Sequence, residues 1–347
     1  MDKKEYGQLA DKVIGMLMNN GADMKTNNHL AMDNWEWPTG VALYSLFKVY
    51  EKSGDNEYLD MLIKWFDHQL SKPAPHRNVN TVAPVLAMVN VYEVTKDEKY
   101  LPHINSWVDW VMNDMPRTHY DGLQHMTVLN HHHEQLWDDT LFMAVLFLAK
   151  AGKLLERKDW VEEAKYQFLI HIKYLQDKVT GLFYHGWTFD RRHNFADAFW
   201  ARGNSWFTSG AVEFIEILDD RDDAVSKYVH AAWVDQVKEL QKYQGIRGLF
   251  NTLLDDEGSY YETSATAGIA YGVHKGIRLG LLDKNVFGDM CNKAIDAVVS
   301  KISEDGTVEG VSFGTGMGHN LQFYKDIAIR PTAYGQGLTF LMLTELI

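Results

Sequence analysis

Six segments of the chain are apolar on nearly every side, and they alternate with segments whose apolar residues form one stripe. A helix that is apolar all round is buried, whereas a one-sided stripe indicates a helix that covers a core. The stripe is clearest over 159–175, where Val161, Ala164, Phe168 and Ile172 follow at steps of three and four residues. The apolar segments, which we predict to be inner helices, are 40–53, 81–95, 139–156, 204–218, 264–281 and 333–346.

Surface-type helices are predicted between the inner ones. Their stripes fit 3–19, 56–72, 98–113, 159–175, 222–243 and 284–302. Inner and surface-type segments alternate along the whole chain at unequal intervals, which indicates a degenerate repeat of helical pairs. An open solenoid needs capping repeats with polar outer faces, and none is obvious. We therefore predict an all-α fold, an (α/α)6 barrel.

Composition places further limits on the chain. Only 7 prolines and no linker-like run are present, which favours a single domain over 1–347. The net charge of -13 disfavours nucleic acid as a partner. No apolar run approaches membrane-spanning length. The lone Cys291 and the polar start of the chain favour a cytoplasmic location. Nothing indicates an oligomeric state.

The connections that lead into the inner helices are long and rich in aromatic, histidine and charged residues. In a closed barrel they all lie at one end, over electropositive helix N-termini that suit an anionic ligand. That end is the predicted binding mouth. The glycine-rich stretch 310–319 lacks a preceding strand and a P-loop lysine, so it suits a flexible lid better than a phosphate cradle. These connections are 20–38, 73–80, 114–138, 178–203, 244–263 and 303–332.

Asp138 and Asp139 begin the third inner helix, directly after Trp137. One aspartate is well explained as an N-cap, and two are explained less well. With an indole before them and apolar residues after them, we expect one carboxyl to be buried enough for a raised pKa. A carboxyl that keeps its proton can act as a general acid.

Tryptophan and arginine residues gather at the other predicted helix starts. Trp200, Arg202 and Trp206 precede or open the fourth inner helix, and Trp37 precedes the first. Indole rings suit sugar faces, and a guanidinium suits an acid group. The alternatives are core indoles with a snorkelling arginine, and a hydrophobic staple at Trp37. We favour a carbohydrate site.

Histidines add less specific signals. His185 ends the segment Gly181–Leu182–Phe183–Tyr184 and is equally well explained as structural. Consecutive histidines at 131–133 point in different directions and have no second ligand set, so we predict no metal and no cofactor. We expect one of the three, His133, to face the site.

At these residues the chain resembles glycoside hydrolase family 105, the unsaturated rhamnogalacturonyl hydrolases, which are related to the unsaturated glucuronyl hydrolases of family 88. The resemblance covers the chain from about residue 35 to its end. It is strongest where two motifs occur together. The matching segments are Asp139–Thr140–Leu141–Phe142–Met143, Trp200–Ala201–Arg202–Gly203–Asn204, 181–187, 262–267 and the turn Gly335–Gln336–Gly337.

The resemblance implies an (α/α)6 barrel and an unusual hydrolysis. The substrate is a small oligosaccharide that carries a C4=C5 double bond left by a polysaccharide lyase, and the enzyme hydrates that enol ether. Asp139 would protonate C4 and then activate water for attack at C5, so one carboxyl serves both steps. Arg202 and His185 would hold the uronate and its ring. The other substrate-binding residues would be Trp37, Asn80, His133, Trp137, Trp200 and Trp206.

Asn80 departs from the family pattern, because many members have an aspartate at this position. A second carboxylate would raise the pKa of the first through like-charge repulsion, and an asparagine cannot. Asn80 can still hydrogen-bond a sugar hydroxyl or Asp139.

Two other functions remain open on the sequence. One is a conventional inverting glycosidase or a sugar epimerase, with Asp138 or Glu262 as second acid group or His185 as base. The other is a non-catalytic sugar-binding protein, in which the tryptophans only stack and Asp139 only caps its helix.

Overall fold

The computed structural model describes residues 1–20 and 30–347, so part of the predicted connection 20–38 lies outside the described residues. Each of the six apolar segments is an inner helix, as predicted. One turn of π-helix, η5 (Leu141–Val145), opens the third of them. The inner helices are α2 (Trp37–Ser53), α4 (Val79–Thr95), α6 (Leu146–Leu154), α8 (Ala201–Leu218), α10 (Thr263–Arg278) and α13 (Ala333–Thr344).

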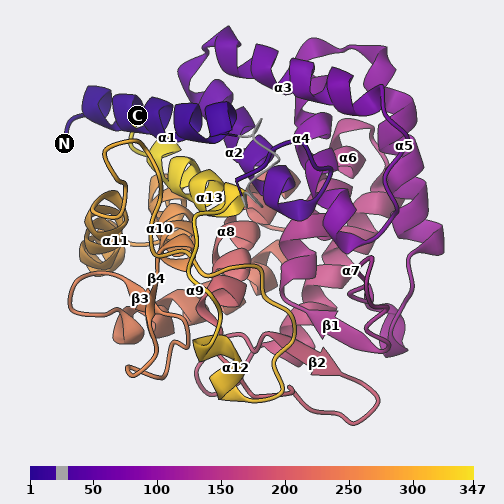
Figure 1. Cartoon of the computed structure of the whole chain (residues 1–347). Helices are drawn as coiled ribbons and strands as arrows, with labels where there is room; N and C mark the ends of the chain where they lie inside the picture. Colours follow the sequence, from indigo (N-terminus) through magenta and orange to yellow (C-terminus); the bar gives the residue numbers. More distant parts are fainter. Residues whose placement is uncertain (21–29) are drawn as a thin grey trace.

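The outer helices also match the predicted stripes, and the inner ring closes. Each inner helix packs against the next, and α13 packs against both α10 and α2. Figure 1 shows the inner helices surrounded by the outer ones. This closure confirms the (α/α)6 barrel over the open solenoid. The outer helices are α1 (Lys3–Asn20), α3 (Asn56–Leu70), α5 (Leu101–Asp109) with the π-helix η3 (Trp110–Asp114), α7 (Lys158–Leu175), α9 (Ala224–Tyr243) and α11 (Lys284–Val299).

Local chemistry fixes where the inner helices begin and how closely they approach. The Asn78 side chain accepts from the amide of Asn80 at 2.9 Å, and Thr81 completes a capping box, so α4 starts with Asn80 in its first turn. A Cβ on Gly40 would lie 2.6 Å from the Pro84 backbone nitrogen. Glycine at that position therefore lets α2 and α4 touch. A continuous buried core extends from α1 to α13, on which the proposal of a single domain rests.

The short strands lie in the long connections. Strand β1 (Gln135–Trp137) pairs antiparallel with β2 (Gly186–Thr188), and β3 (Phe250–Asn251) pairs with β4 (Tyr261–Glu262). These four strands and helix α12 (Leu321–Lys325) gather in the lower part of Figure 1. The elaborate loops thus share one end of the barrel, as predicted. Among the described residues, no helix is both long and apolar enough to cross a bilayer.

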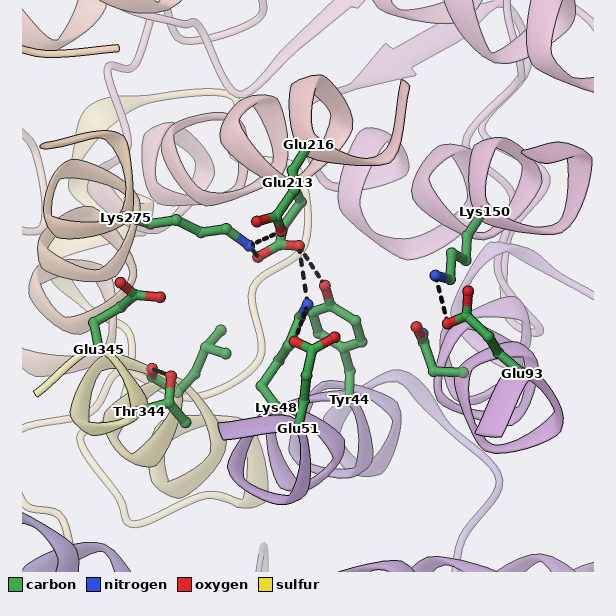
Figure 2. Close-up of polar contacts among 12 residues, drawn as sticks. Tyr44, Lys48, Glu51, Glu93, Lys150, Glu213, Glu216, Lys275, Thr344 and Glu345 are labelled. Carbon is green, nitrogen blue, oxygen red and sulfur yellow. Dashed lines mark hydrogen bonds and ion pairs between the residues drawn. The ribbon is translucent and has the colours of Figure 1, made fainter. Parts of the chain in front are cut away.

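The opposite end of the barrel carries a buried charged cluster, hereafter the Glu213 cluster. Glu213 on α8 accepts hydrogen bonds from the Tyr44 hydroxyl at 2.6 Å, from the Tyr271 hydroxyl and from the Lys275 ammonium. Lys48 lies 3.6 Å from the same carboxylate. Figure 2 shows Tyr44, Lys48 and Lys275 converging on Glu213 from the inner helices. The Glu213 cluster therefore ties α2, α8 and α10 together.

Candidate active site

A cavity of about 510 Å³ opens at the loop end of the barrel. Trp37 stands at the start of α2, Asn80 in the first turn of α4, and Arg202 in the first turn of α8. The cavity therefore lies over the N-termini of inner helices, where the sequence placed it. Its described lining comprises Glu36, Trp37, Asn80, His125, Thr127, Val128, Leu129, Asn130, His132, Trp137, Asp139, Met143, Trp200, Arg202, Gly314, Thr315 and Gly316.

Asp138 is sealed behind this cavity. Strand β1 ends at Trp137, and the amide of Asp138 donates to the His185 carbonyl at 3.1 Å, which turns the carboxyl inward. The side chain is fully buried, and among the described residues neither carboxyl oxygen has a hydrogen-bond partner. A Cβ on Gly203 would lie 2.1 Å from Asp138 Oδ2, so only glycine leaves room there. Burial, followed by the charge of Asp139, raises the pKa of Asp138 well above its ordinary value.

Asp139 faces the cavity with 17% of its side chain exposed. Its Oδ2 lies 3.4 Å from His185 Nε2. Burial acts to raise the pKa of Asp139, but the hydrogen bond from His185 opposes burial, and the pKa is lowered to about 2. The expectation of one raised pKa in this pair therefore falls on Asp138. Asp139 is the ionised partner when the cavity is empty.

His185 lies behind Asp139 and does not line the cavity. It is buried, and its Nδ1 lies 2.8 Å from the Tyr324 hydroxyl. The rings of Trp137 and Trp200 pack on it with centroids 5.2 and 4.4 Å away. The structure therefore places His185 against the carboxyl, and the predicted direct contact with the sugar ring is not supported.

The guanidinium of Arg202 is not free to bind a substrate carboxylate with its two terminal nitrogens. It is fully buried, and its two terminal nitrogens donate to the Ser312 carbonyl and hydroxyl, the Phe313 carbonyl and the Thr315 hydroxyl. Glu262 lies 3.8 Å from the guanidinium and also accepts from the Ser312 amide. Arg202 thus anchors the glycine-rich segment through its terminal nitrogens, and only its Nε has no hydrogen-bond partner among the described residues. Its charge still borders the cavity, which it lines.

Three of the four predicted tryptophans form walls of the cavity. Trp37, Trp137 and Trp200 line it. Trp206 does not, because it is fully buried and packs edge-on against Trp37 at 6.3 Å. Trp206 therefore supports a wall from behind. Trp35, in contrast, belongs to the core beside Trp37, where its indole donates to the Thr81 carbonyl.

The histidine that faces the cavity is His132, and the choice of His133 was wrong. A left-handed φ of 43° at His132 turns the chain, so that neighbouring side chains point to different sides. His132 packs on Trp137 with centroids 4.5 Å apart. His133 is 76% exposed, lies 3.4 Å from Asp190 and lines a separate surface groove. Consecutive residues in a loop carry no periodicity that could have distinguished them.

Two other titratable residues of the cavity, His125 and Glu36, were missed. His125 stacks on Trp137 with centroids 4.0 Å apart, and burial lowers its pKa to about 3, so it is neutral. Glu36, the N-cap residue of α2, has a pKa raised by burial. Its position between Trp35 and Trp37 was the available signal. Nothing in the sequence around His125 marks it as a site residue.

One group of side chains at the site has the spacing that a metal ion needs. Among the described residues, Asp138, Asp139 and His185 offer ligand atoms within 4.8 Å of one another. The same arrangement suits a single proton shared between the carboxyls of Asp138 and Asp139. The buried carboxyl, Asp138, holds that proton. The prediction of a site without metal or cofactor stays a prediction.

The fold and this cavity define a glycoside hydrolase. The chain belongs to Glycosyl Hydrolase Family 88, whose model matches residues 9–347. Over 316 residues it is 32% identical to the unsaturated rhamnogalacturonyl hydrolase YesR of Bacillus subtilis (strain 168), covering 90% of each chain.

Solved structures agree with this assignment. A structure described as a possible member of the GH105 family, from Salmonella enterica serovar Paratyphi A, superposes with a TM-score of 0.95 at 43% identity, covering 99% of this chain and 94% of that one. The unsaturated glucuronyl hydrolase of Bacillus sp. GL1 shares the fold, with a TM-score of 0.75 at 16% identity over 97% of this chain and 96% of that one.

Proposed function

We propose that this glycoside hydrolase removes a Δ4,5-unsaturated uronic acid from short oligosaccharides left by a polysaccharide lyase. Unsaturated galacturonate linked to rhamnose, from rhamnogalacturonan in pectin, is the proposed substrate. The observation that carries the proposal is the paired carboxyl at the cavity floor. Asp139 faces the cavity, and Asp138 is sealed behind it within 4.8 Å. The similarity to YesR supports the choice of aglycone.

The proposed reaction uses the one proton that the carboxyl pair holds. The empty site keeps it on Asp138, whose pKa is raised, beside ionised Asp139. A uronate in the cavity adds negative charge and displaces water, and both effects raise the pKa of Asp139 and draw the proton to it. Asp139 then protonates C4, and the positive charge develops on C5 and the ring oxygen.

The second half of the reaction regenerates the carboxyl. Asp139, now a carboxylate, takes a proton from water as the oxygen bonds to C5. The resulting hemiketal opens and releases the aglycone sugar. The walls formed by Trp37, Trp137 and Trp200 suit the faces of the sugar rings. Asn80 also lines the cavity, which supports its proposed role in binding a sugar hydroxyl.

Two second-carboxyl candidates for an inverting glycosidase do not suit that role. Asp138 is sealed and lies within 4.8 Å of Asp139. Inverting enzymes leave room for a water between their carboxyls, which are roughly 6.5 Å or more apart. Glu262 is fully buried and accepts from Ser264, the Ala265 amide and the Ser312 amide. Among the described carboxyl side chains, only Glu36 lines the cavity together with Asp139. Glu36 is therefore the residue that tests the alternative of an inverting glycosidase.

The experiment follows the ultraviolet absorbance of the conjugated ene-acid in lyase-treated rhamnogalacturonan. We expect the native protein to abolish it, Asp139→Asn to be slower by about 10²–10⁴-fold, and Glu36→Gln to retain most activity. Turnover of a saturated glycoside that depends on Glu36 would favour the inverting glycosidase. No loss of absorbance on any unsaturated uronide would contradict the proposal, and full activity in Asp139→Asn would contradict the assignment of Asp139.

We also propose a cytoplasmic location, where imported oligosaccharides would be processed. The support is the chain's one cysteine, Cys291, which is buried with a pKa that burial raises to about 12. A thiol in this state is unreactive, so the protein needs no oxidising compartment.

A further inference from the structure

The described contacts join the catalytic carboxyl to the C-terminal segment through one tyrosine. Tyr324 lies in α12 and is fully buried, with Ala198, Trp200 and Leu253 around its ring. Its hydroxyl lies 2.8 Å from Nδ1 of His185, which is 139 residues away in sequence. Buried tyrosine hydroxyls find a polar partner, and here the partner is the histidine that touches Asp139.

The direction of the hydrogen bonds follows from the donors present. The Gly318 amide donates to the Tyr324 hydroxyl oxygen at 3.2 Å. The hydroxyl proton has two acceptors in reach, His185 Nδ1 at 2.8 Å and the Met317 sulfur at 3.8 Å. A thioether sulfur accepts only weakly, so the proton goes to the nitrogen. A neutral imidazole that accepts at Nδ1 carries its proton on Nε2. Nε2 is the nitrogen 3.4 Å from Asp139.

We propose that Tyr324 is a positioning residue of this enzyme: it selects the His185 tautomer whose Nε2–H faces Asp139. The inference rests on the proposed function for its catalytic consequence, but the tautomer itself does not depend on the substrate. In the opposite tautomer, the lone pair of Nε2 would face the carboxylate and repel it. The tyrosine thus keeps a donor on the carboxyl that must gain and lose a proton.

The same residue makes the carboxyl depend on how the C-terminal segment is seated. Arg202 holds the segment at residues 312–315. At α12 the segment is held by the ion pair between Lys325 and Asp256 and by the Tyr260 hydroxyl, which donates to the Tyr324 carbonyl at 3.2 Å. Between these anchors, Gly314–Gly316 form a cavity wall. The cavity wall and the hydroxyl that orients His185 therefore belong to one segment, and the Gly318 amide links them by its hydrogen bond to the Tyr324 hydroxyl.

The test compares Tyr324→Phe with a matched control, Tyr100→Phe. Both tyrosines are fully buried, but the Tyr100 hydroxyl has no hydrogen-bond partner among the described residues. Nitrogen-15 NMR of labelled histidine reports which ring nitrogen of His185 is protonated, with His185→Asn used to assign the signals. We expect an Nε2–H form in the native protein and in Tyr100→Phe, and a mixture in Tyr324→Phe. We further expect kcat to fall about tenfold in Tyr324→Phe, with KM within about twofold.

Several outcomes would overturn the inference. Unchanged His185 signals or an unchanged kcat in Tyr324→Phe would do so. If Tyr324→Phe does not fold, 3-fluorotyrosine at position 324 keeps the ring and makes the hydroxyl a stronger donor. The His185 Nδ1 signal must then shift, and no shift refutes the hydrogen bond. If the native protein turns over no unsaturated uronide while the NMR result holds, the proposed function fails and the positioning role stands.

Discussion

At the end of the barrel opposite the mouth, both oxygens of Glu213 accept from buried donors, whereas at the mouth neither oxygen of Asp138 accepts from a donor among the described residues. Both carboxyls are buried. Helix α8 reaches both places, because Arg202 lies in its first turn and Glu213 lies towards its other end. The same helix thus joins a satisfied ionic cluster to an unsatisfied one.

This difference distinguishes the Glu213 cluster, which stabilises the fold, from the carboxyl pair at the mouth, which we propose carries out the reaction. Burial acts to raise the pKa of Glu213, but the charges of Lys275 and Lys48 lower it well below its ordinary value, so it stays ionised. For Asp138, burial and the charge of Asp139 outweigh the opposing effects of a backbone hydrogen bond and the charge of Arg202, so it keeps a proton. Orphaned buried polar atoms reduce stability and concentrate at functional sites. At the mouth the orphaned atoms belong to two adjacent carboxyls and a histidine, Asp138, Asp139 and His185, and this clustering of titratable groups marks the site of chemistry.

The largest expected effect on stability comes from breaking the satisfied cluster. Glu213→Ala leaves Lys275 buried with less compensation, so we expect the free energy of unfolding to fall by about 3–5 kcal/mol. Activity per folded molecule should be unchanged, because the mouth lies at the other end of the inner helices. Chemical denaturation and the ultraviolet assay measure the two quantities. Replacing both partners, Glu213→Met with Lys275→Met, should recover part of the stability, because the buried ammonium of Lys275 is removed and Lys48 keeps its ion pair with Glu51 at 2.8 Å. A loss below about 1 kcal/mol in Glu213→Ala would contradict the structural role.

The unsatisfied cluster should respond in the opposite sense, and with a pH dependence. In the folded protein the pKa of Asp138 is raised, whereas the unfolded chain ionises it near its ordinary value of about 3.9. Its contribution to stability is therefore complete below that pH and is lost as the pH rises towards the folded-state pKa. An asparagine at this position cannot ionise. We expect Asp138→Asn to be more stable than the native protein at pH 7, with the difference shrinking towards pH 4. We also expect this variant to lose activity, because the proton that the two carboxyls share is no longer available.

Asp139→Asn is the matched control for this pH dependence. The pKa of Asp139 is lowered to about 2, so its carboxylate contributes stability that is present above its unfolded pKa and lost as the pH falls. Asp139→Asn should therefore be less stable than the native protein at pH 7. Free energies of unfolding measured from pH 2 to 8 give both slopes, because the Asp139 contribution is lost between its unfolded pKa of about 3.9 and its folded pKa of about 2. If the difference in free energy of unfolding between each variant and the native protein did not change with pH, the proton would not be held by Asp138 as proposed.

The sequence predicted the backbone of the molecule better than the directions of its side chains. Helices such as α4 and α8 could be placed because their periodicity reports burial directly. The location of the mouth followed from loop length. The protonation of Asp138 and Asp139 depends on His185, a neighbour only in space. The pairing of Arg202 with residues 312–315 depends on how a loop folds back, for which its sequence carries no periodic signal. Glu213 stands out in the sequence as an acidic residue within a largely apolar helix, but no role was predicted for it.

The smallest expected effect distinguishes the cavity from the groove beside it. His132 lines the cavity against Trp137, whereas His133 lies outside it with Asp190. Removing a ring that contacts a stacking wall costs binding on the order of 1 kcal/mol, so His132→Ala should raise KM about fivefold with little change in kcat. His133→Ala should change neither, because an exposed ion pair contributes little. Steady-state kinetics on the unsaturated disaccharide measures both variants. If His133→Ala raised KM and His132→Ala did not, the chain would present the opposite histidine to the substrate, and the turn at His132 would have to differ in the complex.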